Sequence, residues 1–167
     1  MKTSPEKSKN DLISLLKDIY KDNGNQLRVI CEFEHEYVSQ NAIWWYTRET
    51  CLYRLLNKAL RSHDFGLLLQ FRFFIANLHK QLTFEHQNFL QCLPSDSDPI
   101  LRVYRGQAIS TDELSTIRAS VGEFISMDSF LSTTTNEAAA LGFAKQVAVE
   151  NDTQRILFDF DIDTRLS

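Results

Sequence analysis

Apolar residues recur at helical spacing in the first part of the chain and alternate with polar residues in the last part. Before residue 94, helical spacing predicts helices over 10–22, 41–61 and 64–86. The helices over 41–61 and 64–86 are joined by a short polar link, so they are predicted to form a hairpin. The segment 27–33 is short, apolar and β-branched, and its pattern leaves helix and strand open.

Residues 94–99 carry two prolines among serines and aspartates, and they mark the change of period. Strands are predicted over 100–105, 129–135 and 155–162. A further strand is predicted in the region that begins at Gly122. In the segment 155–162, Ile and Phe side chains alternate with aspartates, which is typical of a half-buried antiparallel strand.

Two helices are predicted between these strands. Ser110 with Glu113 fits a capping box, and so does Thr134 with Glu137 at the start of an alanine-rich segment. Phe143 is interpreted as a core residue of this second helix, because helical spacing is enough to explain it. Helices followed by mixed strands and helices predict an α+β fold.

The composition is that of an ordinary globular protein, with 43% hydrophobic and 24% charged residues. The net charge of −4 indicates no basic footprint, so nucleic acid is not an expected partner. Residues 1–9 are polar and lysine-rich, and they are interpreted as a solvated tail without the apolar core of a signal peptide. No stretch is long and uncharged enough to span a bilayer, so no membrane contact and a cytoplasmic location are expected.

Two short segments carry candidate chemistry. Strand 100–105 ends in Arg105, followed by Gly106, which pairs a planar cationic fork with backbone that a ligand can approach closely. The second segment ends in four hydroxyl residues, Ser132 to Thr135, which supply short hydrogen-bonding groups. An arginine fork suits a phosphate-bearing ligand better than a lysine does.

Together the two segments resemble the first two motifs of the mono-ADP-ribosyltransferases of the arginine–serine–glutamate class. The second family pattern is Phe-x-Ser-[Ser/Thr]-[Ser/Thr], followed by a helix with a small residue and then Phe. Residues 130–134 and 138–143 match it, with Thr134 where the family more commonly has serine. Upstream, residues 42–49 and the Leu/Arg-rich helix after them look like the helical amino-terminal half of the eukaryotic NAD(P)(+)–protein-arginine ADP-ribosyltransferases.

The resemblance implies specific roles for four residues. Arg105 would hold the pyrophosphate of NAD, and the backbone at Gly106 would help to fix the nicotinamide amide. Ser132 would be the catalytic hydroxyl that positions the family's glutamate, and it would also contribute to cofactor binding. Thr134 would lie beside the nicotinamide ribose.

The same resemblance implies the activity and the partners. The expected reaction is transfer of ADP-ribose from NAD to a protein side chain, with arginine as the expected acceptor and nicotinamide as the product. NAD is then the substrate, no metal is needed, and the partner is a protein with an exposed arginine.

The implied fold is a helical N-terminal subdomain packed on part of the family's split β-sandwich. Residues 1–26 are expected to form a polar tail and a short helix, and 27–167 the ADP-ribosyltransferase domain. Within that domain, 27–93 would be the helical part. Residues 99–167 would be the first part of the NAD-binding β-core, incomplete at its C-terminus.

The family's third motif, a Glu-x-Glu on a later strand, does not follow the hydroxyl run. The chain is therefore expected to be truncated before this motif and inactive alone. The alternative function is a catalytically inactive NAD-binding or protein-interaction module.

Two other sets of polar residues are weaker candidates for a functional site. Asp159, Asp161 and Asp163 share one face of the last strand, and a solvent-facing strand explains them better than the missing acidic motif does. Histidines with neighbouring glutamates, around residue 35 and over 79–86, lack zinc-site spacing and are interpreted as solvated helix faces.

Overall fold

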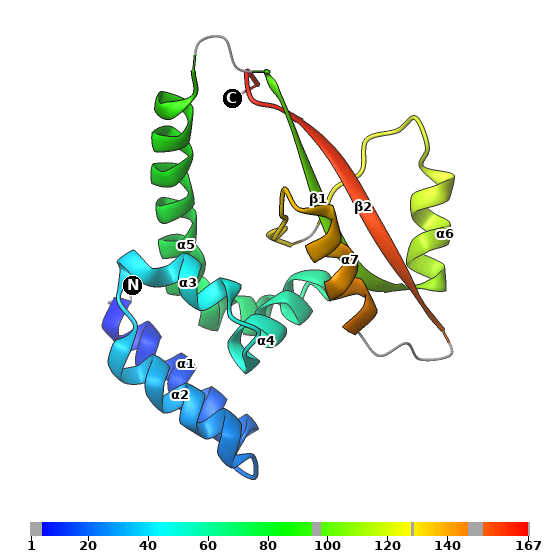
Figure 1. Ribbon diagram of the computed structural model, residues 1–167. Helices are drawn as coiled ribbons and strands as arrows, with labels where there is room; N and C mark the ends of the chain where they lie inside the picture. Colours follow the sequence, from blue (N-terminus) through cyan, green and yellow to red (C-terminus); the bar gives the residue numbers. More distant parts are fainter. Residues whose placement is uncertain (1–4, 95–97, 128, 147–151, 167) are drawn as a thin grey trace. The chain divides into compact units, whose positions relative to one another are not determined.

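The computed structural model describes residues 5–94, 98–127, 129–146 and 152–166. The chain divides into two compact units, Met1–Cys92 and Leu93–Ser167 (Figure 1). The first unit is helical and the second contains two antiparallel strands and two helices. The α+β class predicted from the sequence is confirmed.

The helical unit contains five α-helices and a short 3₁₀ helix among its described residues. They are α1 (Pro5–Ile19), α2 (Gly24–Glu36), η1 (Ser39–Asn41), α3 (Ala42–Thr47), α4 (Cys51–Arg61) and α5 (Phe65–Cys92). Short polar side chains begin three of these helices, as helix N-termini favour: Asn23 for α2, Thr50 for α4 and Asp64 for α5. Asp64 Oδ1 accepts the N–H of Leu67 at 3.0 Å, which confirms the predicted start of α5.

Two sequence predictions for the first part of this unit need correction or completion. The ambiguous segment 27–33 lies inside helix α2. Helix α1 already begins at Pro5, so only residues 1–4 of the expected tail 1–9 lie outside the described residues, and Ser8 is buried. Proline suits the first turn of a helix because the N–H that it lacks would have no intrahelical acceptor there.

The single helix predicted over 41–61 is wrong, because the chain interrupts it at residues 48–50. Arg48 takes an extended conformation with ψ 131°, and Thr50 begins the next helix. The hydroxyl of Thr50 accepts the N–H of Tyr53, so it satisfies a backbone donor that a continuous helix would have bonded itself. The apolar periodicity continues across this break, so the sequence pattern does not indicate it.

An aromatic cluster forms the centre of the helical unit. Phe33 contacts the rings of Tyr37, Trp45 and Phe74, with centroid separations of 4.6, 5.0 and 6.1 Å. Buried leucines and isoleucines surround it; they include Leu12, Leu16, Ile30, Leu52, Leu56 and Leu78. Each such side chain contributes about 1.5–3 kcal/mol by leaving water, so this unit has a substantial core of its own.

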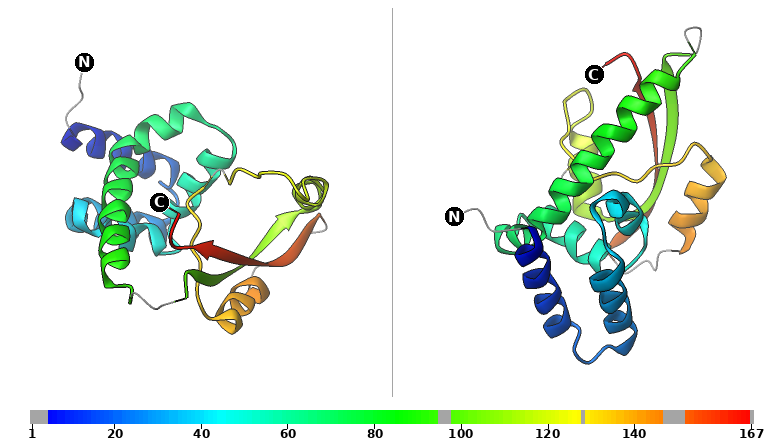
Figure 2. Two further views of the ribbon diagram at one scale, coloured as in Figure 1. Left: turned by 90° about the horizontal axis from the view of Figure 1, so that it is seen from above. Right: turned by 90° about the vertical axis from the view of Figure 1, so that its left-hand side faces the viewer.

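The second unit is built on strands β1 (Ile100–Ser110) and β2 (Thr153–Asp163), which pair antiparallel along their whole length. Helix α6 (Thr111–Ala119) follows β1 directly, and helix α7 (Glu137–Gln146) packs against β1 and β2 (Figure 2). Ser110 Oγ accepts the N–H of Glu113 at 3.1 Å, which confirms the predicted start of α6.

The register sorts the side chains of the two strands between the two faces of the sheet. Directly opposed residues share a face, and Arg105 opposes Phe158 while Gly106 opposes Leu157. One face therefore carries Arg105 with Val103 and Ile109, both buried, and the Phe158 and Phe160 rings stacked 5.6 Å apart. The other face carries Gly106 and is the face on which α7 lies.

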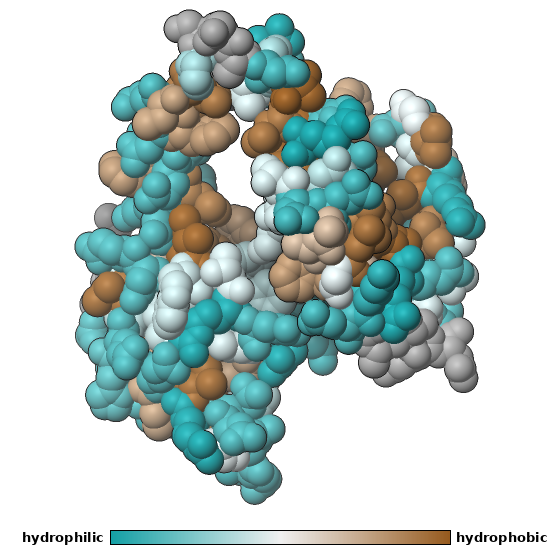
Figure 3. Space-filling model, viewed as in Figure 1, coloured by the Kyte–Doolittle hydropathy of each residue, from teal (hydrophilic) through white to brown (hydrophobic). Residues whose placement is uncertain are grey.

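The strand predictions are confirmed at 155–162 but need correction elsewhere. β1 does not end at Arg105; it continues to Ser110, so Arg105 and Gly106 lie in its middle. The described residues from Gly122 to Thr135 form no strand, and only Thr134 makes an isolated bridge. The sheet of the described residues is thus two-stranded. Hydrophobic side chains remain visible at the surface between α7 and α6 (Figure 3).

Candidate functional site

Arg105 is half-buried in the middle of β1, and two groups of the protein hold its guanidinium. Nε donates a hydrogen bond to Oε1 of Gln107 at 2.8 Å. Nη1 donates to the backbone carbonyl of Ser132 at 2.7 Å. The two motifs singled out in the sequence are therefore in direct contact, although 27 residues separate Arg105 from Ser132.

The hydroxyl run lies along the edge of β1 that β2 leaves open. The N–H of Tyr104 donates to the carbonyl of Thr134 at 2.7 Å, and the N–H of Thr134 donates back to the carbonyl of Tyr104 at 2.9 Å. This pair of hydrogen bonds is the isolated bridge that replaces the predicted strand over 129–135. Ser132 is exposed at one side of the bridge.

Gly106 lies where helix α7 approaches β1 most closely. A Cβ atom at this position would overlap the carbonyl oxygen of Ala140 and lie 3.0 Å from the Cβ of Ala144. Ala140 and Ala144 are buried, so α7 presents its smallest side chains to the strand. Glycine is required here by helix packing, a reason that the sequence analysis did not foresee.

Helix α7 begins differently from the predicted capping box. Asn136 Oδ1 accepts the N–H of Ala139 at 3.0 Å, and the hydroxyl of Thr134 accepts the N–H of Asn136 at 3.1 Å. Thr134 thus supports the turn before the helix. The interpretation of Phe143 as a core residue is wrong, because 59% of its surface is exposed while the alanines face the sheet.

The aspartates of β2 lie on the opposite face of the sheet from Arg105. Asp161 opposes Arg102, which binds it through Nε and Nη2 at 2.8 and 3.1 Å, and Asp159 Oδ1 lies 3.7 Å from the same Nε. The hydrogen bond from Arg102 lowers the pKa of Asp161. Both carboxylates are exposed, as predicted, and their positive partner on β1 is Arg102.

The third aspartate of that strand has a different partner. Asp163 pairs with Arg165, whose hydrogen bonds lower the pKa of this carboxyl to about 2. Each of the three aspartates thus lies within ion-pair distance of an arginine.

Two of the glutamates around residue 35 are likewise engaged. Glu32 binds Arg48 at 2.6 and 3.1 Å, and Glu34 binds Lys17 at 2.6 Å. The hydrogen bond from Arg48 lowers the pKa of Glu32, and the one from Lys17 lowers the pKa of Glu34. Among the described residues, no group of three or more His, Cys, Asp or Glu side chains is arranged to hold a metal ion.

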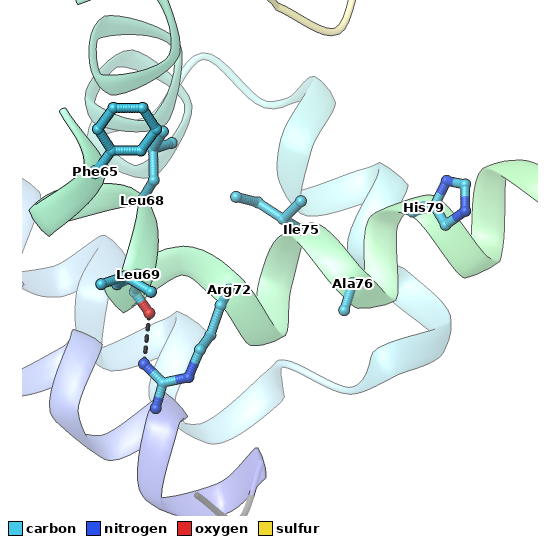
Figure 4. A pocket seen from close by; sticks show the side chains of 7 residues that line it. All are labelled: Phe65, Leu68, Leu69, Arg72, Ile75, Ala76 and His79. Carbon is cyan, nitrogen blue, oxygen red and sulfur yellow. Dashed lines mark hydrogen bonds between the residues drawn. The ribbon is translucent and has the colours of Figure 1, made fainter. Parts of the chain in front are cut away.

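A shallow apolar groove lies on α5, in the helical unit (Figure 4). All the residues that line it belong to that one helix: Phe65, Leu68, Leu69, Arg72, Ile75, Ala76 and His79. It contains none of the candidate site residues. Within the described ranges, no helix is both long and apolar enough to cross a lipid bilayer.

Comparison with known protein families gives a match over residues 20–155, most of the chain, to the family model described as ART: NAD:arginine ADP-ribosyltransferase. The chain belongs to this family. The matched range includes Arg105, Gly106, Ser132 and Thr134, and it ends before Asp159. No curated protein and no solved structure matched the chain.

Membership of the NAD:arginine ADP-ribosyltransferase family implies NAD-dependent ADP-ribosyl transfer. The N–H groups of the Arg105 guanidinium are donors that suit an anionic group such as a pyrophosphate. Nη2 of Arg105 donates no hydrogen bond to any described residue, so this side of the guanidinium remains available.

Gln107 contacts Arg105 but is not among the site residues predicted from the sequence. Period-two alternation places residues 105 and 107 on the same face of a strand, and that signal was present. It was overlooked because the predicted strand ended at residue 105.

Proposed function

We propose that residues 99–167 bind NAD at the open edge of β1, and that the protein transfers ADP-ribose to an arginine side chain of an acceptor protein. The observation that carries this proposal is the hydrogen bond from Nη1 of Arg105 to the carbonyl of Ser132. It joins the cationic group and the hydroxyl run into one site, although the strand predicted for the run is absent. Family membership supplies the reaction type.

In this proposal Arg105 binds the pyrophosphate. A guanidinium that is already held in place loses less side-chain entropy when an anion binds, and charge-assisted bonds to phosphate are strong. When bound, NAD supplies the ADP-ribosyl group that is transferred, with nicotinamide as the leaving group.

Gly106 is proposed to contact the nicotinamide amide through its backbone. Tyr104 directs its N–H and C=O to the edge of β1 that faces Thr134. Backbone groups two residues apart on a strand point to the same edge, so those of Gly106 are directed there as well. Gly106 thus offers one donor and one acceptor beside the hydroxyl run, which matches the paired donor and acceptor of a carboxamide.

Ser132 and Thr134 are proposed to act through their hydroxyls. Ser132 is exposed and is assigned the positioning of a catalytic carboxylate. The oxygen of Thr134 already accepts the N–H of Asn136, and its O–H hydrogen remains for a ribose oxygen. Asp159 and Asp161 are unsuited as the carboxylate, because register places them on the opposite face from Arg105.

A second candidate function is a non-catalytic NAD-binding module. The specific observation in its favour is that neither β1 nor β2 places a carboxylate on the face that carries Arg105. NAD binding is common to both candidates, whereas transfer belongs only to the first.

The test is to replace Arg105 with lysine and to measure NAD binding by calorimetry. Loss of the bidentate fork is expected to raise the dissociation constant for NAD about tenfold or more. A change of this size corresponds to the loss of one hydrogen bond to a charged group. The melting temperature should stay nearly unchanged. Arg118→Lys on the exposed surface of α6 is the matched control and should bind NAD normally.

Unchanged NAD affinity in Arg105→Lys would remove Arg105 from the site. A parallel incubation with labelled NAD and peptides that carry either arginine or lysine separates the two candidates when it uses a longer form of the protein that includes a Glu-x-Glu segment. Label on the arginine peptide supports the transferase. NAD binding without any label transfer supports the binding module.

A further inference from the structure

Gln107 and Arg105 form a side-chain pair on one face of β1. They are two residues apart, and the amide oxygen of Gln107 accepts the Nε–H of Arg105 at 2.8 Å. Both side chains are half-buried. Arg105 is therefore held from its own strand as well as from the carbonyl of Ser132.

The two contacts determine which part of the guanidinium remains available. Gln107 occupies Nε–H, and Ser132 occupies one N–H of Nη1. A guanidinium binds an anion in bidentate fashion either through Nε with Nη2 or through its two terminal nitrogens. With Nε engaged, the edge formed by Nη1 and Nη2 is the one left to face a phosphate.

The chemical type of residue 107 is significant. An amide oxygen accepts the Nε hydrogen and carries no charge, so the full positive charge of Arg105 stays available for an anion. A carboxylate at this position would also accept the hydrogen, but it would neutralise the guanidinium and compete with the phosphate. An apolar side chain would leave Nε–H free and the guanidinium less restrained.

We propose that Gln107 is a positioning residue, which holds Arg105 through Nε so that the Nη1–Nη2 edge meets the pyrophosphate of NAD. This inference rests on the proposed function of Arg105. It assigns Gln107 no contact with the ligand; its effect on binding passes through Arg105.

The test uses Gln107→Met, which keeps the length of the side chain and removes its acceptor. Binding of ADP-ribose and of NAD is measured by calorimetry, with adenosine as a ligand that has no phosphate. The dissociation constants of ADP-ribose and NAD are expected to rise about tenfold, while that of adenosine stays unchanged. Gln154→Met, at an exposed position of β2, is the matched control and should bind all three normally.

A double-mutant cycle shows whether Gln107 acts through Arg105. Lysine has no Nε–H at that position, so adding Gln107→Met to Arg105→Lys should cause no further loss of affinity. An equal loss in both backgrounds would overturn the proposal, because Gln107 would then act independently. Normal ADP-ribose binding by Gln107→Met alone would also overturn it.

NMR of the arginine Nε–H groups of the unbound chain gives a readout that does not depend on binding. The Arg105 signal, assigned by its loss in Arg105→Lys, should exchange slowly in the unaltered protein and faster in Gln107→Met. Equal exchange overturns the proposal. If Gln107→Met does not fold, Gln107→Glu replaces it and should keep the Nε–H protected while weakening NAD binding.

Failure of the proposed function has a different signature. If the unaltered chain binds neither NAD nor ADP-ribose, the proposed function fails together with the positioning role. If the unaltered chain binds both and Gln107→Met does so equally well, the positioning role alone fails.

Discussion

Arg105 and Gly106 are adjacent, but their side-chain positions lie on opposite faces of β1. Arg105 lies on the face with Gln107, and Gly106 lies beneath α7. Successive side chains of a strand point to opposite faces, so one residue of this pair faces the polar site while the other contacts a helix. The requirement for glycine is steric, because the carbonyl of Ala140 occupies the space that a Cβ would need.

Gly106→Ala is therefore expected to destabilise the protein. Overpacking of a tight contact costs about 1–3 kcal/mol, and here the obstacle is backbone, which does not rotate away. Gly142→Ala in α7 is the control: no atom lies within 4 Å of a Cβ built there. It should be neutral or stabilising by up to about 1 kcal/mol, since alanine favours helix.

Urea denaturation followed by circular dichroism measures both changes. If Gly106→Ala is as stable as Gly142→Ala, α7 does not pack on β1 as described.

In the helical unit, an ion pair links two helices at the point where the predicted long helix is interrupted. Arg48, at the end of α3, binds Glu32 of α2 and lies over the rings of Trp44 and Trp45, 4.4 and 4.8 Å from their centroids. The break at residues 48–50 thus directs a cation toward α2. About a third of each charged side chain is exposed, so its effect on stability is modest.

Glu32→Gln should lower stability at neutral pH by up to about 1 kcal/mol. The folded pKa of Glu32 is lowered from its ordinary 4.5, so the ion pair stabilises the fold above that value. This contribution is lost as pH falls through the lowered folded pKa. The difference in melting temperature between the two proteins should be constant from neutral pH to about pH 5 and shrink below 4.5.

The control for this measurement is Glu36→Gln, an exposed position on the same helix. Its melting temperature should follow that of the unaltered protein across the range. If the difference in melting temperature between Glu32→Gln and the unaltered protein grows as the pH falls, the ion pair between Glu32 and Arg48 does not stabilise the fold as described.

The two units of the molecule differ in how much apolar surface they bury. The helical unit encloses an aromatic cluster around Phe33. In the second unit, the buried apolar side chains among the described residues are Val103, Ile109, Ala140 and Ala144. A two-stranded sheet with a small core is marginally stable, so the unit with the candidate site should open more readily.

Hydrogen exchange followed by mass spectrometry tests this expectation. Peptides from α2 and from the buried part of α5 should exchange more slowly than peptides from β1 and β2. Bound NAD should slow exchange in β1, where Arg105 and Gly106 lie. Strand peptides that exchange as slowly as the segment around Phe33 without NAD would show that the second unit is the more stable one.

The amino-acid sequence by itself determined the elements whose signals are local. Helix starts at Asp64 and Ser110 follow from short polar side chains that bond to nearby N–H groups, and strand β2 follows from alternation. Arg105 and Ser132 were also identified from sequence, because each stands in a short motif.

Tertiary structure decided what depends on neighbours distant in the chain. β1 continues through Gly106 because β2 pairs with it along its full length and α7 covers it, and neither contact is visible in a local pattern. Thr134 forms a single bridge to Tyr104 where a strand was predicted, and Phe143 is exposed because alanines fill the helix contact. The strand register, which also depends on long-range pairing, placed Asp161 away from Arg105.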